Sequence, residues 1–233
     1  MITVHRHNPV LLNKLLIQAR QETPQALLSL LQSLSVSESR TAGYLLAERV
    51  LPTFEADRYW AFFLAIVPTR PRAYLGTFLK AAVKLYKEDR LPLNDEVLTL
   101  FAAQASPIDV RKTLESLLGV SRTTAEVEML IRIFCHSELE SAAPHLLKTG
   151  TPQAYYVLFQ LLKTVEAHPE ILRHHAILLI RKGDTLSYNL ASIIRQYFDL
   201  ADLPGTFSLR MEPYELSRLE QGPEVFLKLL KGM

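Results

Sequence analysis

Residues 151–184 read TPQAYYVLFQLLKTVEAHPEILRHHAILLIRKGD and contain the start and stop signals of two consecutive helices. Pro152 and Pro169 each occupy a first helical position, where the missing N–H is harmless because that donor has no partner within the helix. Gly183 follows the second apolar run, as a left-handed cap requires. Both runs are apolar around most of their circumference, so we expect two helices that are covered on more than one side.

The same signals recur along most of the chain, and sustained alternation of apolar and polar residues appears only at its two ends. We therefore predict an all-α protein in which twelve helices start near residues 9, 24, 37, 53, 71, 93, 107, 121, 137, 152, 169 and 184. Two short helices, at about 213–220 and 223–231, close the chain. Three helix starts carry a capping residue that precedes an acid: Ser35 with Glu38, Asn94 or Asp95 near Glu96, and Thr123 with Glu126. Three helix ends are marked by a glycine: Gly119, Gly150 and Gly183.

The spacing of these starts indicates helix pairs that repeat about every 32 residues. Helices of this length, joined by turns of two to four residues, pack antiparallel to their neighbours because the connections are too short for another arrangement. The prediction is an array of about 12–14 short antiparallel helices, an α-solenoid. We expect a single helical domain over residues 1–202, with residues 203–233 packed on it as an extended segment and short helices.

In helix length and spacing, residues 8–200 resemble the HEAT-like helical repeat proteins. The tetratricopeptide pattern and the ankyrin Thr-Pro-Leu-His are both absent. The resemblance concerns architecture alone and transfers no functional residue. It implies a curved scaffold that holds another macromolecule.

Composition and charge narrow the class of protein. The chain has 233 residues, 48% of them apolar, and a formal net charge of +2. We expect no secretory signal and no membrane insertion, because the longest apolar run, Tyr59 to Val67, is far shorter than the ~18 residues of a spanning helix. The lone Cys135 excludes an internal disulfide and a cysteine-rich zinc site. These features predict a soluble, cytoplasmic protein.

The two ends alternate in polarity. We hypothesise that residues 1–5 and 206–211 pair as short strands, and the alternative is a loop laid over the helices.

Two aromatic clusters are candidate partner-binding sites: Tyr59 with Trp60, and Tyr155 with Tyr156. Tyr59, Trp60, Phe62 and Phe63 cannot all face one stripe of a helix, so we expect at least one ring to face outward. Exposed tyrosine and tryptophan are favoured anchors at interfaces. Burial between two layers of helices is the alternative.

A basic stripe is the candidate phosphate-binding site. Lys80, Lys84 and Lys87 share one face of the helix that starts near residue 71, and Arg58 and Arg72 lie near them in sequence. Such a stripe can follow a phosphate backbone. A solvated helix face is the alternative, since lysines opposite an apolar face are common.

Catalytic and metal-binding motifs are absent. No glycine-rich phosphate loop, Gly-x-Ser-x-Gly or His-Glu-x-x-His occurs, and neither the histidines at 168, 174 and 175 nor Cys135 has the neighbours that a metal site or a nucleophile needs. Some HEAT-like proteins of similar length are DNA glycosylases that use tryptophans and an aspartate in a basic groove. This chain has a single tryptophan, Trp60, and Asp57 is the only candidate for a catalytic aspartate near it in sequence. We predict no cofactor and no metal, and no recognisable machinery supports an enzyme.

The leading hypothesis is therefore a non-catalytic protein-interaction scaffold, which presents a broad helical surface to a protein partner or to a second copy. The alternative is a HEAT-like protein that binds nucleic acid through the basic stripe, including an alkylated-base DNA glycosylase.

Overall fold

Helices begin where the sequence places caps. In the computed structural model, which describes residues 8–21, 24–204 and 209–232, the Asn8 side chain accepts a hydrogen bond from the N–H of Leu11 at 3.0 Å. Both predicted capping boxes form, at Ser35 and at Thr123. Of the two alternatives left open near residue 94, Asn94 is the cap.

The described residues form fourteen α-helices and no strand, which confirms the all-α prediction. The largest difference from a predicted start is three residues, and it occurs twice, between residue 53 and Ala56 and between residue 121 and Thr124. The helices are α1 Pro9–Ala19, α2 Gln25–Ser33, α3 Val36–Leu45, α4 Ala56–Ile66, α5 Pro71–Lys87, α6 Asp95–Gln104, α7 Pro107–Leu118, α8 Thr124–Cys135, α9 Leu139–Thr149, α10 Pro152–Lys163, α11 Pro169–Lys182, α12 Thr185–Tyr197, α13 Pro213–Arg218 and α14 Pro223–Leu230.

Helix ends follow the sequence less closely. Gly150 and Gly183 adopt the predicted left-handed conformation, with φ values of 66° and 80°. The prediction for Gly119 is wrong, because α7 closes instead with a turn in which the N–H groups of residues 120 and 121 both bond to the Leu117 carbonyl. His136 provides an unpredicted left-handed cap for α8, with φ of 53°. The π-helical turn Leu46–Val50 that extends α3 also has no clear sequence signal.

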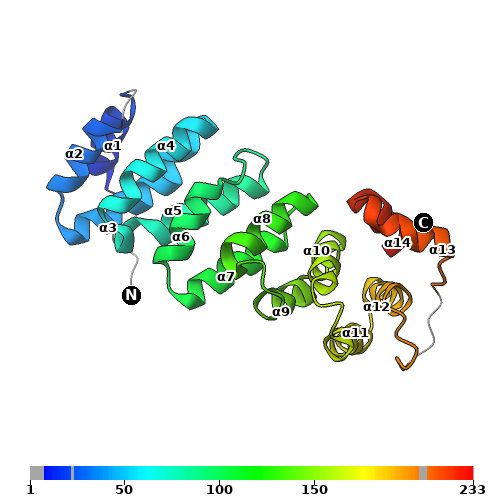
Figure 1. Cartoon of the computed structure of the whole chain (residues 1–233). Coiled ribbons are helices and arrows are strands. Elements are labelled where there is room, and N and C mark those ends of the chain that lie inside the picture. The colour runs from blue at the N-terminus through cyan, green and yellow to red at the C-terminus, as the bar shows by residue number, and fades with distance from the viewer. Residues whose placement is uncertain (1–7, 22–23, 205–208, 233) are drawn as a thin grey trace. The chain divides into compact units, whose positions relative to one another are not determined.

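The chain forms two compact units, Met1–Arg111 and Lys112–Met233, and the boundary falls inside α7. The predicted limit at residue 202 stays a prediction. In the N-terminal unit, α1 packs on α2 and α3, α3 packs on α5, and α4 packs on α6 (Figure 1). Helices thus contact both the next helix and the next but one, which is the arrangement of stacked helix pairs.

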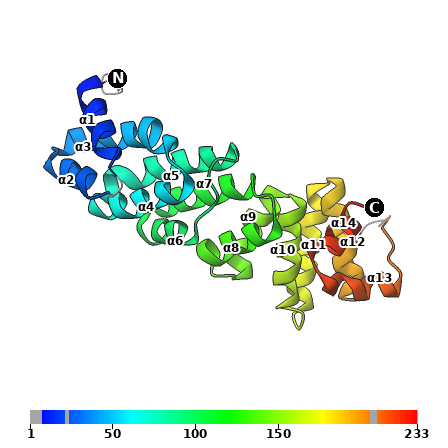
Figure 2. The ribbon, with the colours of Figure 1, turned by 90° about the horizontal axis from the view of Figure 1, so that it is seen from above.

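The C-terminal unit has the same arrangement (Figure 2). Here α10 contacts α8, α9 and α12, and α11 contacts α12. The helices α8, α10 and α12 therefore form one layer. The last helix, α14, packs on α10 and α12 within this unit.

Four basic side chains donate hydrogen bonds to backbone carbonyls of an earlier helix or helical turn at similar sequence separations. Arg58 bonds to the carbonyls of Ala19 and Gln21, Arg70 to that of Leu34, Arg90 to that of Pro52, and Lys182 to that of Leu147. The separations lie between 35 and 39 residues. In each case a basic side chain binds backbone carbonyls at or just beyond the end of an earlier helix or helical turn, where such groups lack partners and the helix dipole favours a positive charge. These separations exceed the predicted helix-pair period of about 32 residues by three to seven residues.

The two most apolar helices differ in burial. Eight of the twelve residues of α10 are buried, which confirms that it is covered on more than one side. The same prediction for residues 171–180 is wrong, since α11 buries Leu172, Ala176 and Leu179 while the remaining isoleucines and Leu178 are partly exposed. The helix α11 has α12 as its main neighbour, so one of its sides faces solvent.

The strand pairing between residues 1–5 and 206–211 lies largely outside the described residues. Leu209 and Met211, which are described, are not in a strand.

Candidate functional site

All four aromatic candidates are buried in the helix stack. The exposed fractions are 0% for Tyr59, 8% for Trp60, 0% for Tyr155 and 9% for Tyr156. Phe62 and Phe63 are buried as well, so the expectation that one of these rings faces outward is wrong.

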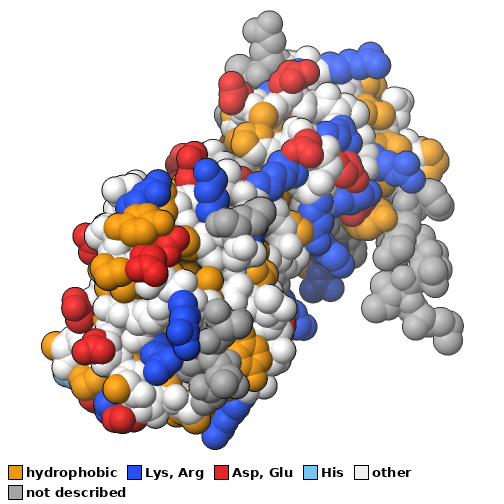
Figure 3. All heavy atoms as spheres, turned by 90° about the vertical axis from the view of Figure 1, so that its right-hand side faces the viewer, with side chains coloured by type: hydrophobic (Ala, Val, Ile, Leu, Met, Phe, Trp, Pro, Cys, Tyr) orange, Lys and Arg blue, Asp and Glu red, His pale blue; other side chains and the backbone are white. Residues whose placement is uncertain are grey.

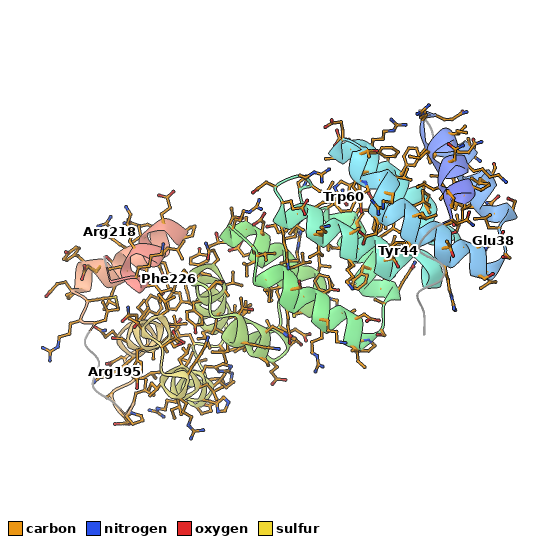
Figure 4. All side chains as sticks on the ribbon, turned by 180° about the vertical axis from the view of Figure 1, so that it is seen from behind. Glu38, Tyr44, Trp60, Arg195, Arg218 and Phe226 are labelled. Atoms are coloured by element: carbon orange, nitrogen blue, oxygen red, sulfur yellow. The ribbon has the colours of Figure 1, made fainter. Side chains whose placement is uncertain are left out.

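The α4 cluster is buried because neighbouring segments cover several sides of this helix. Edge-to-face ring contacts join Trp60 to Phe63 at 5.7 Å and Phe63 to Phe78 of α5 at 5.7 Å. Trp60 is labelled in Figure 4. The Tyr59 hydroxyl donates to the Phe78 carbonyl at 3.2 Å, and burial raises the pKa of Tyr59 well above its usual value. These rings are core residues, so an interface through them would require the core to open.

Arg58 has a structural role. Its Nη2 donates to the carbonyls of Ala19 and Gln21, both at 2.7 Å, and its guanidinium lies over the Phe54 ring at 4.3 Å. The side chain therefore caps the end of α1 and stacks on an aromatic ring, and it is not free to bind a phosphate. The side chain of Arg72 lies outside the described part of the chain.

The three lysines of the basic stripe are exposed together on α5, as the sequence predicts. Lys80, Lys84 and Lys87 lie opposite the buried face of the helix, and within the part of the chain that the structure describes none of them forms an ion pair. The structure thus brings together the three lysines of the predicted phosphate-binding site, whereas Arg58 binds backbone carbonyls near the end of α1.

A second exposed feature was not selected from the sequence. On α1, Val10 is 66% exposed, Ile17 is 51% exposed and Leu16 is 36% exposed, while Leu11 and Leu15 face the core. Residues 10 and 17 are seven apart, so they lie on the same side of the helix. The sequence shows that α1 is apolar on nearly all sides. This pattern alone does not indicate which side other helices cover and which side stays exposed.

A polar cluster in the C-terminal unit contains a lysine, a tyrosine and a serine. Lys182 Nζ donates to the Tyr155 hydroxyl at 2.9 Å, and the Tyr155 hydroxyl lies 2.6 Å from Ser187 Oγ. The Ser187 hydroxyl in turn donates to the Asp184 carboxylate at 2.6 Å. Ser187 and Tyr155 are fully buried, and Asp184 is the cap of α12. The cluster therefore joins α10 to the start of α12 rather than presenting a nucleophile to a substrate.

The pKa values of three carboxyl groups, those of Glu38, Asp184 and Glu220, are lowered, whereas a general acid needs a raised pKa. Hydrogen bonds from the Ser35 side chain and backbone lower the pKa of Glu38, and those from Tyr197 lower that of Glu220. Burial raises the pKa of Asp184, but hydrogen bonds from Ser187 outweigh it, so the net shift is downward. Asp57 is exposed and Trp60 lies in the core, so the pair does not form the groove of a glycosylase.

The N-terminal unit has an open pocket of about 280 Å³ whose lining includes Thr53, Glu55, Tyr59 and Arg90. Arg90 is held by the Pro52 carbonyl at 2.6 Å and by Glu88 at 3.4 Å. Within the described ranges no group of three or more His, Cys, Asp or Glu side chains is arranged to hold a metal ion. The pocket therefore presents no recognisable reaction centre.

On the side of the C-terminal unit turned toward the viewer in Figure 3, basic, acidic and apolar side chains are interspersed. Among the helices that the structure describes, none is long and apolar enough to cross a membrane.

Cys135 is buried, and its chemistry can be tested. Burial, together with the charge of Glu138, raises the pKa of the Cys135 thiol to about 11, so only about 0.1% is thiolate at pH 8. We expect alkylation by iodoacetamide to be more than about 100-fold slower in the native protein than in urea, where the pKa returns to ~8.5. Intact-mass spectrometry over time measures both rates. Equal rates would show that the thiol is accessible.

Comparison with known proteins gives no match to a family model, to a curated protein or to a solved structure.

Proposed function

We propose that this chain is a non-catalytic protein-interaction scaffold of HEAT-like helical repeats, and that a protein partner binds the outer face of α1. The exposure of Val10 and Ile17 is the observation that supports this proposal most directly. Exposed apolar side chains that lie together on one side of a helix are typical of an interaction surface. An apolar side on α1 therefore favours a covered surface.

The regular construction of the stack supports the scaffold role. Basic side chains such as Arg58 and Arg70 connect helices across 36 to 39 residues, while Val10 and Ile17 of α1 remain 66% and 51% exposed. Rigid helix pairs present such a face without a change of conformation, which limits the entropic cost of binding.

Affinity purification from cells of the source organism tests this proposal. The variant V10S/I17S removes two apolar side chains whose burial contributes about 1.5–3 kcal/mol each, so recovery of a bound partner is expected to fall tenfold or more. Ile108→Ser is the matched control, because Ile108 is 58% exposed on α7. Equal recovery with both variants, at unchanged thermal stability, would contradict the proposal.

Nucleic-acid binding is the second candidate, and the lysines of α5 are the observation that favours it. Three neutralised phosphates correspond to a slope of about −2.7 in log K against log salt for duplex DNA. We expect K80Q/K84Q/K87Q to abolish this slope in fluorescence anisotropy with a labelled duplex.

A second triple variant provides the control for net charge. K14Q/K112Q/K228Q removes the same charge from exposed lysines on three other helices. If both triple variants weaken binding equally, the interaction depends on overall charge and α5 is not a site.

A further inference from the structure

The outer face of α1 combines apolar and basic side chains. Lys14 follows Val10 by four residues and precedes Ile17 by three, so these three side chains lie on one side of the helix, and Arg20 comes three residues after Ile17. Residues 8–21 contain no acidic residue. Within the described ranges neither Lys14 nor Arg20 forms an ion pair. This face is therefore complementary to a surface that is both apolar and acidic.

Glu38 of α3 lies within electrostatic range of Lys14, but its carboxylate is bonded elsewhere. Its Oε2 accepts from Ser35 Oγ at 2.6 Å and from the Ser35 N–H at 2.9 Å. Among the residues that the structure describes, none bonds to the ammonium group of Lys14. That group can therefore pair with an acidic residue of a partner.

The helix α13 presents apolar and acidic side chains to solvent. Pro213 and Tyr214 are exposed, Tyr214 by 61%, and Glu212 and Glu215 flank them in sequence. Residues 212–224 contain four acidic residues and one basic residue. In the described part of the chain, no ion pair neutralises Glu212 or Glu215. In charge and in apolar character this surface is the complement of the outer face of α1.

The position of α13 is set by residues outside the helix. The helix buries none of its own six residues. The N–H of Met211, just before it, donates to Gln196 Oε1 of α12 at 2.9 Å, and Leu219, just after it, is buried. Because both ends are held, Tyr214 and its flanking glutamates are presented in a fixed position, which limits the entropic cost of binding.

We propose that α13 of a second copy of this chain binds the outer face of α1. The Tyr214 ring packs between Val10 and Ile17, and the two glutamates that flank the ring pair with the basic residues of α1. This inference rests on the proposed binding role of α1 and names the partner. Because the two surfaces differ, the contact is head-to-tail, and each added copy leaves one α1 and one α13 open to a further copy. Two short helices form a small interface, so the association is weak and requires a high protein concentration.

Sedimentation velocity of the full-length chain, from about 5 to about 500 µM, measures this association. The wild-type sedimentation coefficient is expected to rise with concentration beyond that of a dimer. V10S/I17S and Tyr214→Ser are each expected to stay monomeric, since each lacks one of the two surfaces. Their equimolar mixture is expected to form dimers and nothing larger, because only one intact α1 can meet one intact α13. Ile108→Ser is the matched control and is expected to associate like the wild type.

The variant E212Q/E215Q tests the contribution of charge. Glutamine can keep the capping contacts at the start of α13, so the helix is retained. We expect the association to weaken about three- to tenfold and to depend less on salt, because exposed ion pairs are screened. If neither these substitutions nor salt changes the association, the proposed pairing of α13 with α1 is overturned.

Three other results would overturn the inference. A wild-type chain that stays monomeric at the highest concentration does not bind its own α13. Loss of association in V10S/I17S but not in Tyr214→Ser would show that two copies meet through α1 alone. A different protein crosslinked at position 17 would replace the second copy as the occupant, and the proposed function of α1 would still stand.

Discussion

Phe159→Ala is expected to lower the free energy of unfolding of the C-terminal unit by about 3–5 kcal/mol. Phe159 is fully buried on α10, and its ring lies 5.1 Å from Tyr197, 6.0 Å from Phe198 and 5.1 Å from Phe226. The alanine variant removes most of a large side chain from the point where α10, α12 and α14 meet. Short turns and the polar bonds of α12 restrict how far these helices can move inward, so a cavity remains.

Urea denaturation followed by circular dichroism measures this loss. Tyr214→Ala is the matched control, because Tyr214 is 61% exposed on α13 and its replacement is expected to change stability by no more than about 0.5 kcal/mol. A loss below about 1 kcal/mol for Phe159→Ala would show that the three helices do not share one core at this residue.

Arg70→Met is expected to destabilise the N-terminal unit by about 2–3 kcal/mol. Arg70 Nη1 donates to the Leu34 carbonyl at 3.0 Å and to the buried Ser39 hydroxyl, and Nη2 donates to the Gln32 carbonyl at 3.3 Å. Methionine keeps the apolar part of the side chain. The loss therefore comes from carbonyl and hydroxyl groups without partners and from the charge at the end of α2.

Two further variants separate charge from geometry. Arg70→Lys keeps the charge but cannot bond to several acceptors with a planar guanidinium, so we expect it to recover less than half of the loss. Arg40→Met removes an exposed arginine of α3 and is expected to change stability by no more than about 0.5 kcal/mol. If Arg70→Met and Arg40→Met have equal effects in urea denaturation, the hydrogen bonds of Arg70 do not hold α2.

Helix starts were predictable because the signals are local. A cap such as Asn8 and a proline such as Pro152 act on the backbone within three residues, so the sequence contains all the information. The cap at His136 was missed, since histidine adopts φ > 0 without a sequence pattern that indicates it.

Burial was less predictable because it depends on which helix covers which side. The aromatic run of α4 and the apolar α11 have similar patterns, yet Trp60 is buried while Leu178 is partly exposed. The difference arises from packing partners that are distant in sequence. For the same reason the sequence pointed to Arg58 as a phosphate ligand, although its acceptors are the carbonyls of residues 19 and 21.

The lysines of α5 and the apolar side of α1 illustrate the same limit for the candidate site. Lys80, Lys84 and Lys87 were predictable as a group because a lysine seldom enters a core. Val10 and Ile17 were not, since an apolar residue on an apolar helix is normally buried.

Site-specific photocrosslinking at position 17 tests the proposed function most directly. With a benzophenone amino acid in place of Ile17, the account predicts a protein adduct in cells, and it predicts that Val10→Glu in the same chain abolishes the adduct. The same group in place of Glu140, an exposed residue of α9, is expected to give no such adduct. No adduct at position 17, or the same adducts at both positions, would contradict the claim that α1 is the binding face.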